Sequence, residues 1–116
     1  MRTILIVDDH PSFRACARQV LEAEGFEVVG EAENGVRALR IAEELHPDVV
    51  LLDVNLPDLD GFQVAARLTA SGNGPAVVLT SSRDGGDYGK LVGECGARGF
   101  VPKDELSGDR VTSLVP

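Results

Sequence analysis

Five short apolar runs alternate with helical patterns along this chain, and this alternation restricts its fold more than any other feature. The runs are Ile4–Val7, Val28–Ala32, Val49–Leu52, Ala76–Leu79 and Gly99–Val101. Each run is followed by apolar residues three or four positions apart, which is the spacing of one helix face. Strands that alternate strictly with helices run parallel, because each helix carries the chain back along the sheet. The sequence therefore predicts an α/β domain with helices on both faces of one parallel sheet.

The helical patterns form five apolar stripes that we expect to face the sheet. In chain order they are Phe13, Cys16, Val20 and Leu21; Ala38, Ile41, Ala42 and Leu45; Gly61, Val64, Ala65 and Leu68; Tyr88, Leu91, Val92 and Cys95; and a weaker stripe at Val111, Leu114 and Val115. On this basis both cysteines, Cys16 and Cys95, are predicted to be buried small hydrophobic residues. Residues 84–99 contain six of the 13 glycines, including Gly89 and Gly93, which predicts a weak fourth helix.

The composition of the runs also predicts the order of the strands. The first, third and fourth runs are continuously apolar, as strands covered on both faces need to be. The second run is interrupted by Gly30 and Glu31, and the fifth is followed by Pro102, a residue that belongs at a sheet edge. Right-handed crossovers then favour the order 2-1-3-4-5, the flavodoxin-like arrangement.

Charge and length exclude several classes of function. The chain has 116 residues, the size of one domain, and its 19 acidic and 11 basic residues give a net charge of −8. This balance argues against direct nucleic-acid binding and against docking on an anionic membrane. No apolar run approaches the ~20 residues that span a bilayer, and the first ten residues are not typical of a signal peptide. We therefore expect a cytoplasmic protein.

Polar residues follow the predicted strands at their carboxyl ends, where ligands bind in such sheets. They are Asp8, Asp9, Asp53, Thr80, Ser81 and Lys103. A helix cap, a strand end or a surface lysine could explain any one of them, but not the whole set. Three clustered carboxylates repel one another unless a cation joins them. Because no cysteine or histidine is expected to take part, with His10 only flanking the site, the oxygen ligands favour Mg2+ or alternatively Mn2+.

The same residues lie in motifs that resemble those of bacterial two-component response regulator receiver domains. The matching segments are IVDDHPSFR, LLDVNLPDLDG, VVLTSS and GARGFVPKD, in the expected order and covering nearly the whole chain. Many receivers have Lys-Pro in the last motif, whereas here Pro102 precedes Lys103 and Asp104 follows it, an arrangement similar to receivers of LuxR-type regulators. We therefore expect residues 1–116 to form a single receiver domain without an output domain.

The resemblance implies a role for each site residue. Asp53 would accept a phosphoryl group from a sensor histidine kinase. Asp9 and Asp53 would bind Mg2+ directly, Asp8 through water, and Asn55 through its backbone carbonyl. A last set of residues would contact the phosphoryl group or relay its presence: Lys103, Thr80, the amide of Ser81 and the switch aromatic Phe100.

Other functions are weighed against this one. The domain is not expected to be an enzyme beyond its own phosphorylation and slow dephosphorylation, and a homodimer is left open. One alternative is a Mg2+-dependent phosphatase of the haloacid-dehalogenase type, although that family has its Asp-x-Asp after the first strand. Another is a degenerate receiver that only binds partners. A flavin-binding module is disfavoured, because the loop after the first run lacks a phosphate cradle rich in serine, threonine and glycine.

Overall fold

A five-stranded parallel sheet forms the centre of the molecule in a computed structural model that describes residues 2–82 and 88–115. The strands are β1 (Thr3–Val7), β2 (Glu27–Ala32), β3 (Val49–Asp53), β4 (Ala76–Ser81) and β5 (Gly99–Pro102). Their order, β2-β1-β3-β4-β5, confirms the flavodoxin-like prediction and its two edge strands.

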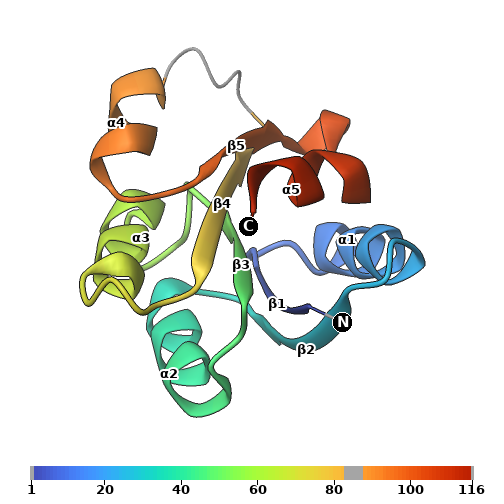
Figure 1. Cartoon of the computed structure of the whole chain (residues 1–116), viewed down its shortest axis with the longest axis horizontal. Coiled ribbons are helices and arrows are strands. Elements are labelled where there is room, and N and C mark those ends of the chain that lie inside the picture. Colours follow the sequence, from blue (N-terminus) through green and yellow to red (C-terminus); the bar gives the residue numbers. More distant parts are fainter. Residues whose placement is uncertain (1, 83–87, 116) are drawn as a thin grey trace.

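Helices cover both faces of the sheet (Figure 1). They are α1 (Pro11–Ala23), α2 (Gly35–Leu45), α3 (Gly61–Thr69), α4 (Gly89–Glu94) and α5 (Gly108–Leu114), with a short 3-10 turn, η2 (Lys103–Glu105), after β5. Helices α1 and α5 lie on one face, and α2, α3 and α4 lie on the other (Figure 1).

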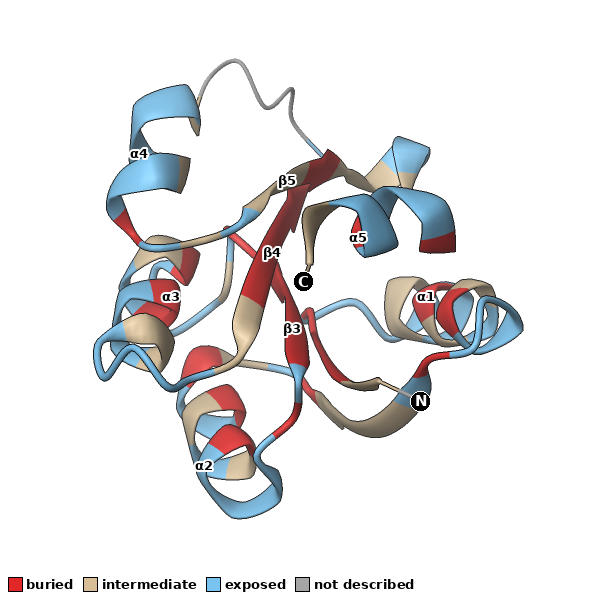
Figure 2. Ribbon diagram, viewed as in Figure 1, coloured by how far each residue is buried: buried red, intermediate tan, exposed pale blue. Residues whose placement is uncertain are grey.

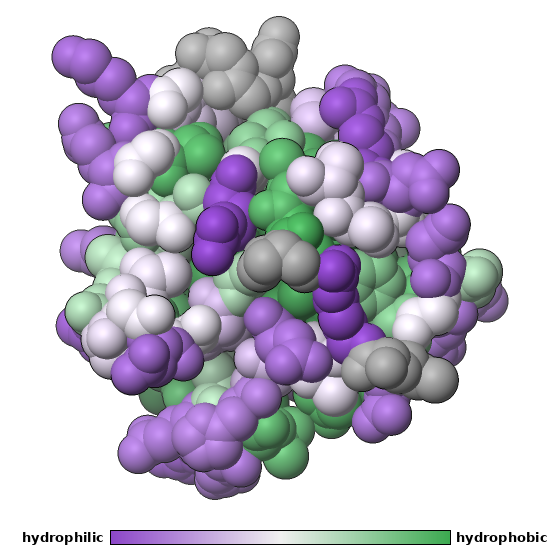
Figure 3. Space-filling view, viewed as in Figure 1, coloured by the Kyte–Doolittle hydropathy of each residue, from purple (hydrophilic) through white to green (hydrophobic). Residues whose placement is uncertain are grey.

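The interior strands place alternate residues in two separate cores, one on each face. On β1, Leu5 and Val7 belong to the core under α2, α3 and α4, whereas Ile4 and Ile6 belong to the core under α1 and α5. Burial is densest along β3 and β4, and on the helices it is confined to the sides that face the sheet (Figure 2). On the face shown in Figure 3, hydrophilic residues lie mainly around the edge, and apolar residues are exposed nearer the centre. This two-sided burial explains why these strands read as continuous apolar runs.

Three stripe residues are not buried as predicted. Cys16 is exposed, because α1 turns Ala17 and Leu21 toward the sheet instead, whereas Cys95 is buried as expected. Leu45, at the last turn of α2, is 49% exposed. Leu91 is 45% exposed, because α4 has only six residues and buries none of them, leaving Tyr88, Val92 and Cys95 as its contacts with the core.

The predicted weak fourth helix is α4, and it contains both Gly89 and Gly93. The expectations that concern residues 84–86 lie outside the described residues. Among the residues that the structure describes, no helix has the length and apolarity needed to cross a membrane.

Candidate functional site

Three of the polar residues at the carboxyl edge, Asp8, Asp53 and Thr80, share one face of the sheet because of strand alternation. Asp53 continues the alternation of Leu51, and Thr80 that of Val78, both of which pack in the core under α1 and α5. Asp53 and Thr80 are also register partners on β3 and β4. Asp8 follows Ile6 at the end of β1 in the same way. The fold thus brings these three side chains to the carboxyl edge that the sequence predicted, and places them on one face there.

Lys103 joins two of the carboxylates. Its Nζ lies 2.6 Å from Oδ2 of Asp8 and 3.4 Å from Oδ2 of Asp53. The same Nζ stands 4.7 Å from the ring centroid of Phe13 on α1, a cation–π contact that the sequence did not predict. Asp8 is fully buried and Asp53 is 2% exposed, so the ammonium provides the positive charge that two buried carboxylates need.

Burial and neighbouring charges together shift the pKa values of Asp53 and Lys103. Burial raises the pKa of Asp53 above its usual value, and the nearby Asp8 charge adds to this rise, against the lowering effects of the Asn55 N–H and of Lys103. For Lys103, burial lowers the pKa, but the Asp8 and Asp53 carboxylates outweigh burial and leave the pKa above its usual value. Lys103 therefore stays charged, while Asp53 is a more basic carboxylate than a solvent-exposed one.

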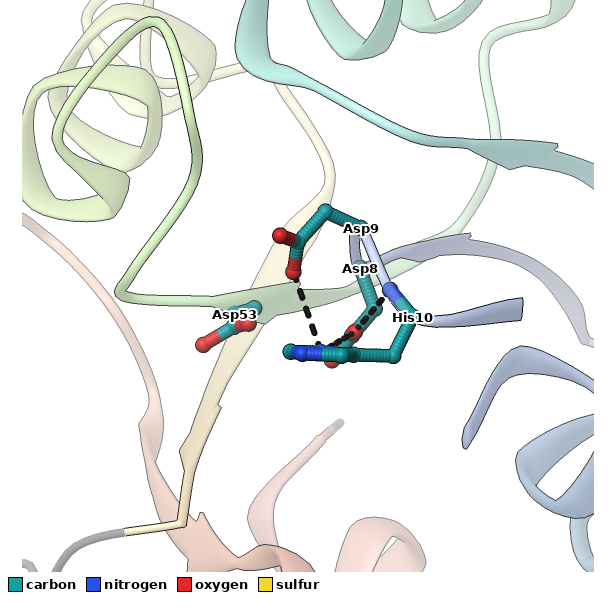
Figure 4. A group of neighbouring side chains, drawn as sticks. All are labelled: Asp8, Asp9, His10 and Asp53. Carbon is teal, nitrogen blue, oxygen red and sulfur yellow. Dashed lines mark hydrogen bonds and ion pairs between the residues drawn. The ribbon is translucent and has the colours of Figure 1, made fainter. Parts of the chain in front are cut away.

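Asp9 and His10 complete the group from the loop after β1 (Figure 4). Nδ1 of His10 lies 3.0 Å from Oδ1 of Asp8 and 3.0 Å from Oδ1 of Asp9. One ligand atom from each of Asp8, Asp9, His10 and Asp53 falls within 4.8 Å of the others. His10 therefore contacts the carboxylates rather than only flanking them, whereas the expectation that the metal ligands are oxygen atoms alone stays a prediction. Strand and helix patterns do not show where a loop side chain turns.

Asn55, Thr80 and Ser81 line the site on the β4 side. The backbone N–H of Asn55 donates to Oδ1 of Asp53 at 3.0 Å, and its side-chain Nδ2 lies 3.4 Å from the Ser81 hydroxyl. Thr80 is fully buried, and its hydroxyl has no hydrogen-bond partner among the described residues. A buried hydroxyl without a partner costs free energy, so its retention here is consistent with a ligand that it would contact.

Phe100 lies on the other face of the sheet. It is the register partner of Leu79, and it packs with the core under α2, α3 and α4. Its ring centroid is 5.7 Å from that of Tyr88, which in turn lies 5.5 Å from that of Phe62 on α3. Phe100 therefore does not contact the carboxylates, and any response to them has to pass through β4 and β5.

The loop after Asp53 is fixed by residues whose part the sequence analysis missed. The Asp58 carboxylate accepts hydrogen bonds from the N–H groups of Gly35 and Val36 at the start of α2, and these bonds lower the pKa of Asp58. Asp60 caps α3 through a reciprocal capping box with Gln63. The pattern of Asp, two intervening residues and Gln was readable in the sequence, whereas the long-range bonds of Asp58 were not.

The loop after β1 is held by Arg14. Its Nη1 donates to the backbone carbonyl of Asp8 at 2.6 Å, and its Nε donates to Glu31 at the end of β2 at 3.1 Å. Arg18 donates to the other Glu31 oxygen at 2.9 Å. These bonds fix the backbone that carries Asp8, so the acidic loop is anchored to the edge strand.

A doubly wound parallel sheet with three carboxylates and a lysine converging at its carboxyl edge defines the class of receiver domains that the sequence motifs resembled. Comparison with protein families agrees, because the profile of the response regulator receiver domain matches residues 4–114. The chain belongs to this family. The match does not favour the phosphatase or the binding-only alternative.

Similar proteins include regulators of transcription and a solved receiver structure. BvgA of Bordetella pertussis is 42% identical over 102 residues, which are 88% of this chain and 49% of that protein. The DNA-binding transcriptional activator EvgA of Escherichia coli K12 is 35% identical over 101 residues, covering 87% of this chain and 50% of EvgA. The signal receiver domain of NarL from Mycobacterium tuberculosis is 34% identical, with a TM-score of 0.89 over 97% of this chain and 94% of that one. The chain thus spans about half the length of these curated relatives.

Proposed function

We propose that this receiver accepts a phosphoryl group on Asp53 from the phosphohistidine of a sensor histidine kinase. The observation that carries the proposal is the position of Asp53, which ends the central strand, is 2% exposed and faces both Lys103 and the carboxylates of the β1 loop. An Asp53 oxygen attacks phosphorus and forms the new O–P bond, while the N–P bond of the donor breaks and its electron pair returns to the imidazole. The product is an acyl phosphate.

The residues present fit a hard divalent cation. Oxygen atoms of three carboxylates lie within 4.8 Å of one another. Among the described residues, Lys103 is paired with two of these carboxylates, Asp8 and Asp53. We propose that Asp9 and Asp53 hold Mg2+ directly, with Asp8 acting through water and the Asn55 carbonyl completing the protein ligands; Mn2+ suits the same donors. When bound, the cation supplies positive charge beside the phosphoryl oxygens.

The remaining residues act on the phosphoryl group. The Lys103 ammonium sits beside Oδ2 of Asp53 and would pair with a phosphoryl oxygen as charge develops there. The unpartnered Thr80 hydroxyl would donate to another oxygen, and the Ser81 amide would assist. Movement of Thr80 toward the phosphoryl group would pull on β4 and so reach Phe100 on the opposite face, which we propose as the switch aromatic.

The structure distinguishes the two aspartates of the β1 loop. Asp8 is fully buried and already paired with Lys103, whereas the Asp9 side chain is 35% exposed and faces His10. We therefore expect Asp9→Ala to weaken Mg2+ binding more than Asp8→Ala. Asp8→Ala removes one of the clustered carboxylates and so reduces the repulsion among them. It also removes an ion-pair partner of Lys103, which acts against that gain in stability. Mg2+ titration of both variants by calorimetry tests this order, and equal losses would contradict it.

Several wider properties are part of the proposal. We propose that residues 1–116 act as one receiver unit whose only catalysis is its own phosphorylation and slow dephosphorylation, and that it works in the cytoplasm with its kinase. The net charge of −8 argues against direct binding of nucleic acid by this domain. A homodimer is compatible with the proposal but is not required by it.

Incubation with acetyl phosphate, followed by intact mass measurement, tests the function. The wild-type chain should gain one phosphoryl group when Mg2+ is present and none when EDTA removes it. Asp53→Asn should gain none, whereas Asp104→Asn, which changes an exposed carboxylate next to Lys103, should label like wild type. Undiminished labelling of Asp53→Asn, or labelling that ignores Mg2+, would overturn the proposal.

A further inference from the structure

His10 holds an imidazole nitrogen against two carboxylates of the cation site (Figure 4). Nδ1 is 3.0 Å from Oδ1 of both Asp8 and Asp9, so the ring stands between the two aspartates rather than beside one of them. His10 is the N-cap residue of α1, but its side chain makes no capping hydrogen bond. The His10 ring therefore does not cap α1.

The backbone around His10 is held in place. Its N–H donates to Oδ1 of Asp8 at 2.8 Å, and Pro11 occupies the first position of α1. Arg14 holds the Asp8 carbonyl from the other side. These contacts restrict the backbone that carries the ring, and a donor on a restricted backbone binds at a lower entropic cost than one on a mobile loop.

The positive charge of Lys103 occupies a different part of the group. Its Nζ contacts the Oδ2 atoms of Asp8 and Asp53, whereas His10 faces the Oδ1 atoms of Asp8 and Asp9. Within the described part of the chain, the buried Oδ2 of Asp8 has Lys103 as its ion-pair neighbour and no hydrogen-bond partner. Because Oδ1 of Asp8 accepts the His10 N–H, a cation on the His10 side would meet the carboxylate of Asp9, which is not among the carboxylates that contact the lysine.

We propose that His10 is a nitrogen ligand of this site, so that the site selects first-row transition-metal dications such as Co2+ more strongly than an all-oxygen site would. The inference rests on the cation site of the proposed function. The four donors lie within 4.8 Å of one another, close to the separation of two ligands on opposite sides of one ion at ~2.1 Å each. Imidazole nitrogen favours transition metals, whereas Mg2+ prefers oxygen and keeps its waters.

Calorimetric titration of the full chain with Co2+ and, separately, Mg2+ tests the inference. His10→Phe keeps a flat ring of similar size but removes both nitrogens. We expect it to weaken Co2+ binding by about tenfold or more while changing the Mg2+ affinity by less than about threefold, in line with the loss of one supporting group at a metal site. The matched control is His46→Asn, which removes the second histidine of the chain and should leave both affinities unchanged.

A spectroscopic readout separates a ligand from a structural residue. Co2+ should produce one strongly shifted imidazole N–H resonance in the proton NMR spectrum of wild type and of His46→Asn, and none in His10→Phe. Equal loss of Co2+ and Mg2+ affinity in His10→Phe, or an unchanged Co2+ affinity, would overturn the inference. Failure of wild type to bind Mg2+ at all would instead overturn the proposed function.

Discussion

Gly61, the first residue of α3, lets the helix approach the end of β3 that carries Asp53. A Cβ at Gly61 would lie 2.5 Å from the Asp53 carbonyl oxygen and 2.5 Å from Cα of Val54. Ordinary non-bonded contacts between carbon atoms are about 3.5–4.0 Å, so α3 and the loop would have to separate by about 1 Å. Both contacts are with backbone atoms, which cannot rotate away, and the N–H of Gly61 also donates to the Val54 carbonyl at 3.0 Å.

We therefore expect Gly61→Ala to lower the free energy of unfolding by about 1–3 kcal/mol, the range for overpacking in a close-packed site. For a domain of this size each kcal/mol corresponds to about 4 °C in Tm. The displaced loop also carries the phosphoacceptor, so labelling by acetyl phosphate should slow as well.

Gly89→Ala is the matched control, because no atom of the described residues, apart from its chain neighbours and its own helix backbone, lies within 4 Å of the added Cβ, and its φ is not positive. The same chemical change should raise stability by up to about 1 kcal/mol through helix propensity. Urea unfolding followed by circular dichroism measures both variants. A Gly61→Ala chain as stable as wild type, or equal losses in the two variants, would show that the close approach of α3 to β3 does not require glycine.

Three further predictions follow from the site and from α4. The pKa of Asp53 is higher in the folded chain than in the unfolded chain. The contribution of this carboxyl group to folding stability is therefore fully present below the pKa of the unfolded chain, and it is lost as the pH rises through the folded pKa. Asp53→Asn should thus gain stability over wild type across that interval in EDTA, and a gap independent of pH in urea unfolding would contradict this. Thr80→Ala should still be labelled but show smaller phosphorylation-dependent NMR shifts at Phe100, whereas Thr80→Ser should keep them; equal shifts in all three chains would refute the coupling. Amides of α4 should exchange faster than those of α1 and respond to phosphorylation, and Gly89→Ala with Gly93→Ala should slow them; exchange as slow as in α1 would contradict a weakly held α4.

The strand order was predictable because a strand that is buried on both faces has to be apolar along its whole length. Continuous apolar runs have to lie inside the sheet, and Pro102 has to lie at its edge, so little freedom remained. The convergence of Asp8, Asp53 and Lys103 followed from topology alone, since all parallel strands end at the same edge.

Side-chain direction was less predictable than topology. Cys16 and Ala17 are neighbours, and a rotation of one residue along α1 decides which of them faces the sheet. The turn of His10 into the acidic group and the contact of Lys103 with Phe13 depend on loop conformation and on packing between distant elements. Periodicity carries no information about either.

Asp53 is the residue that we propose to carry the phosphoryl group. Borohydride reduction of the chain after acetyl phosphate and Mg2+ treatment converts an acyl phosphate on aspartate to homoserine, and peptide mass spectrometry then locates the change. Homoserine is expected at position 53 and at no other aspartate. Homoserine at Asp8 or Asp9, or a phosphoryl group that survives on a serine, threonine or histidine, would contradict it.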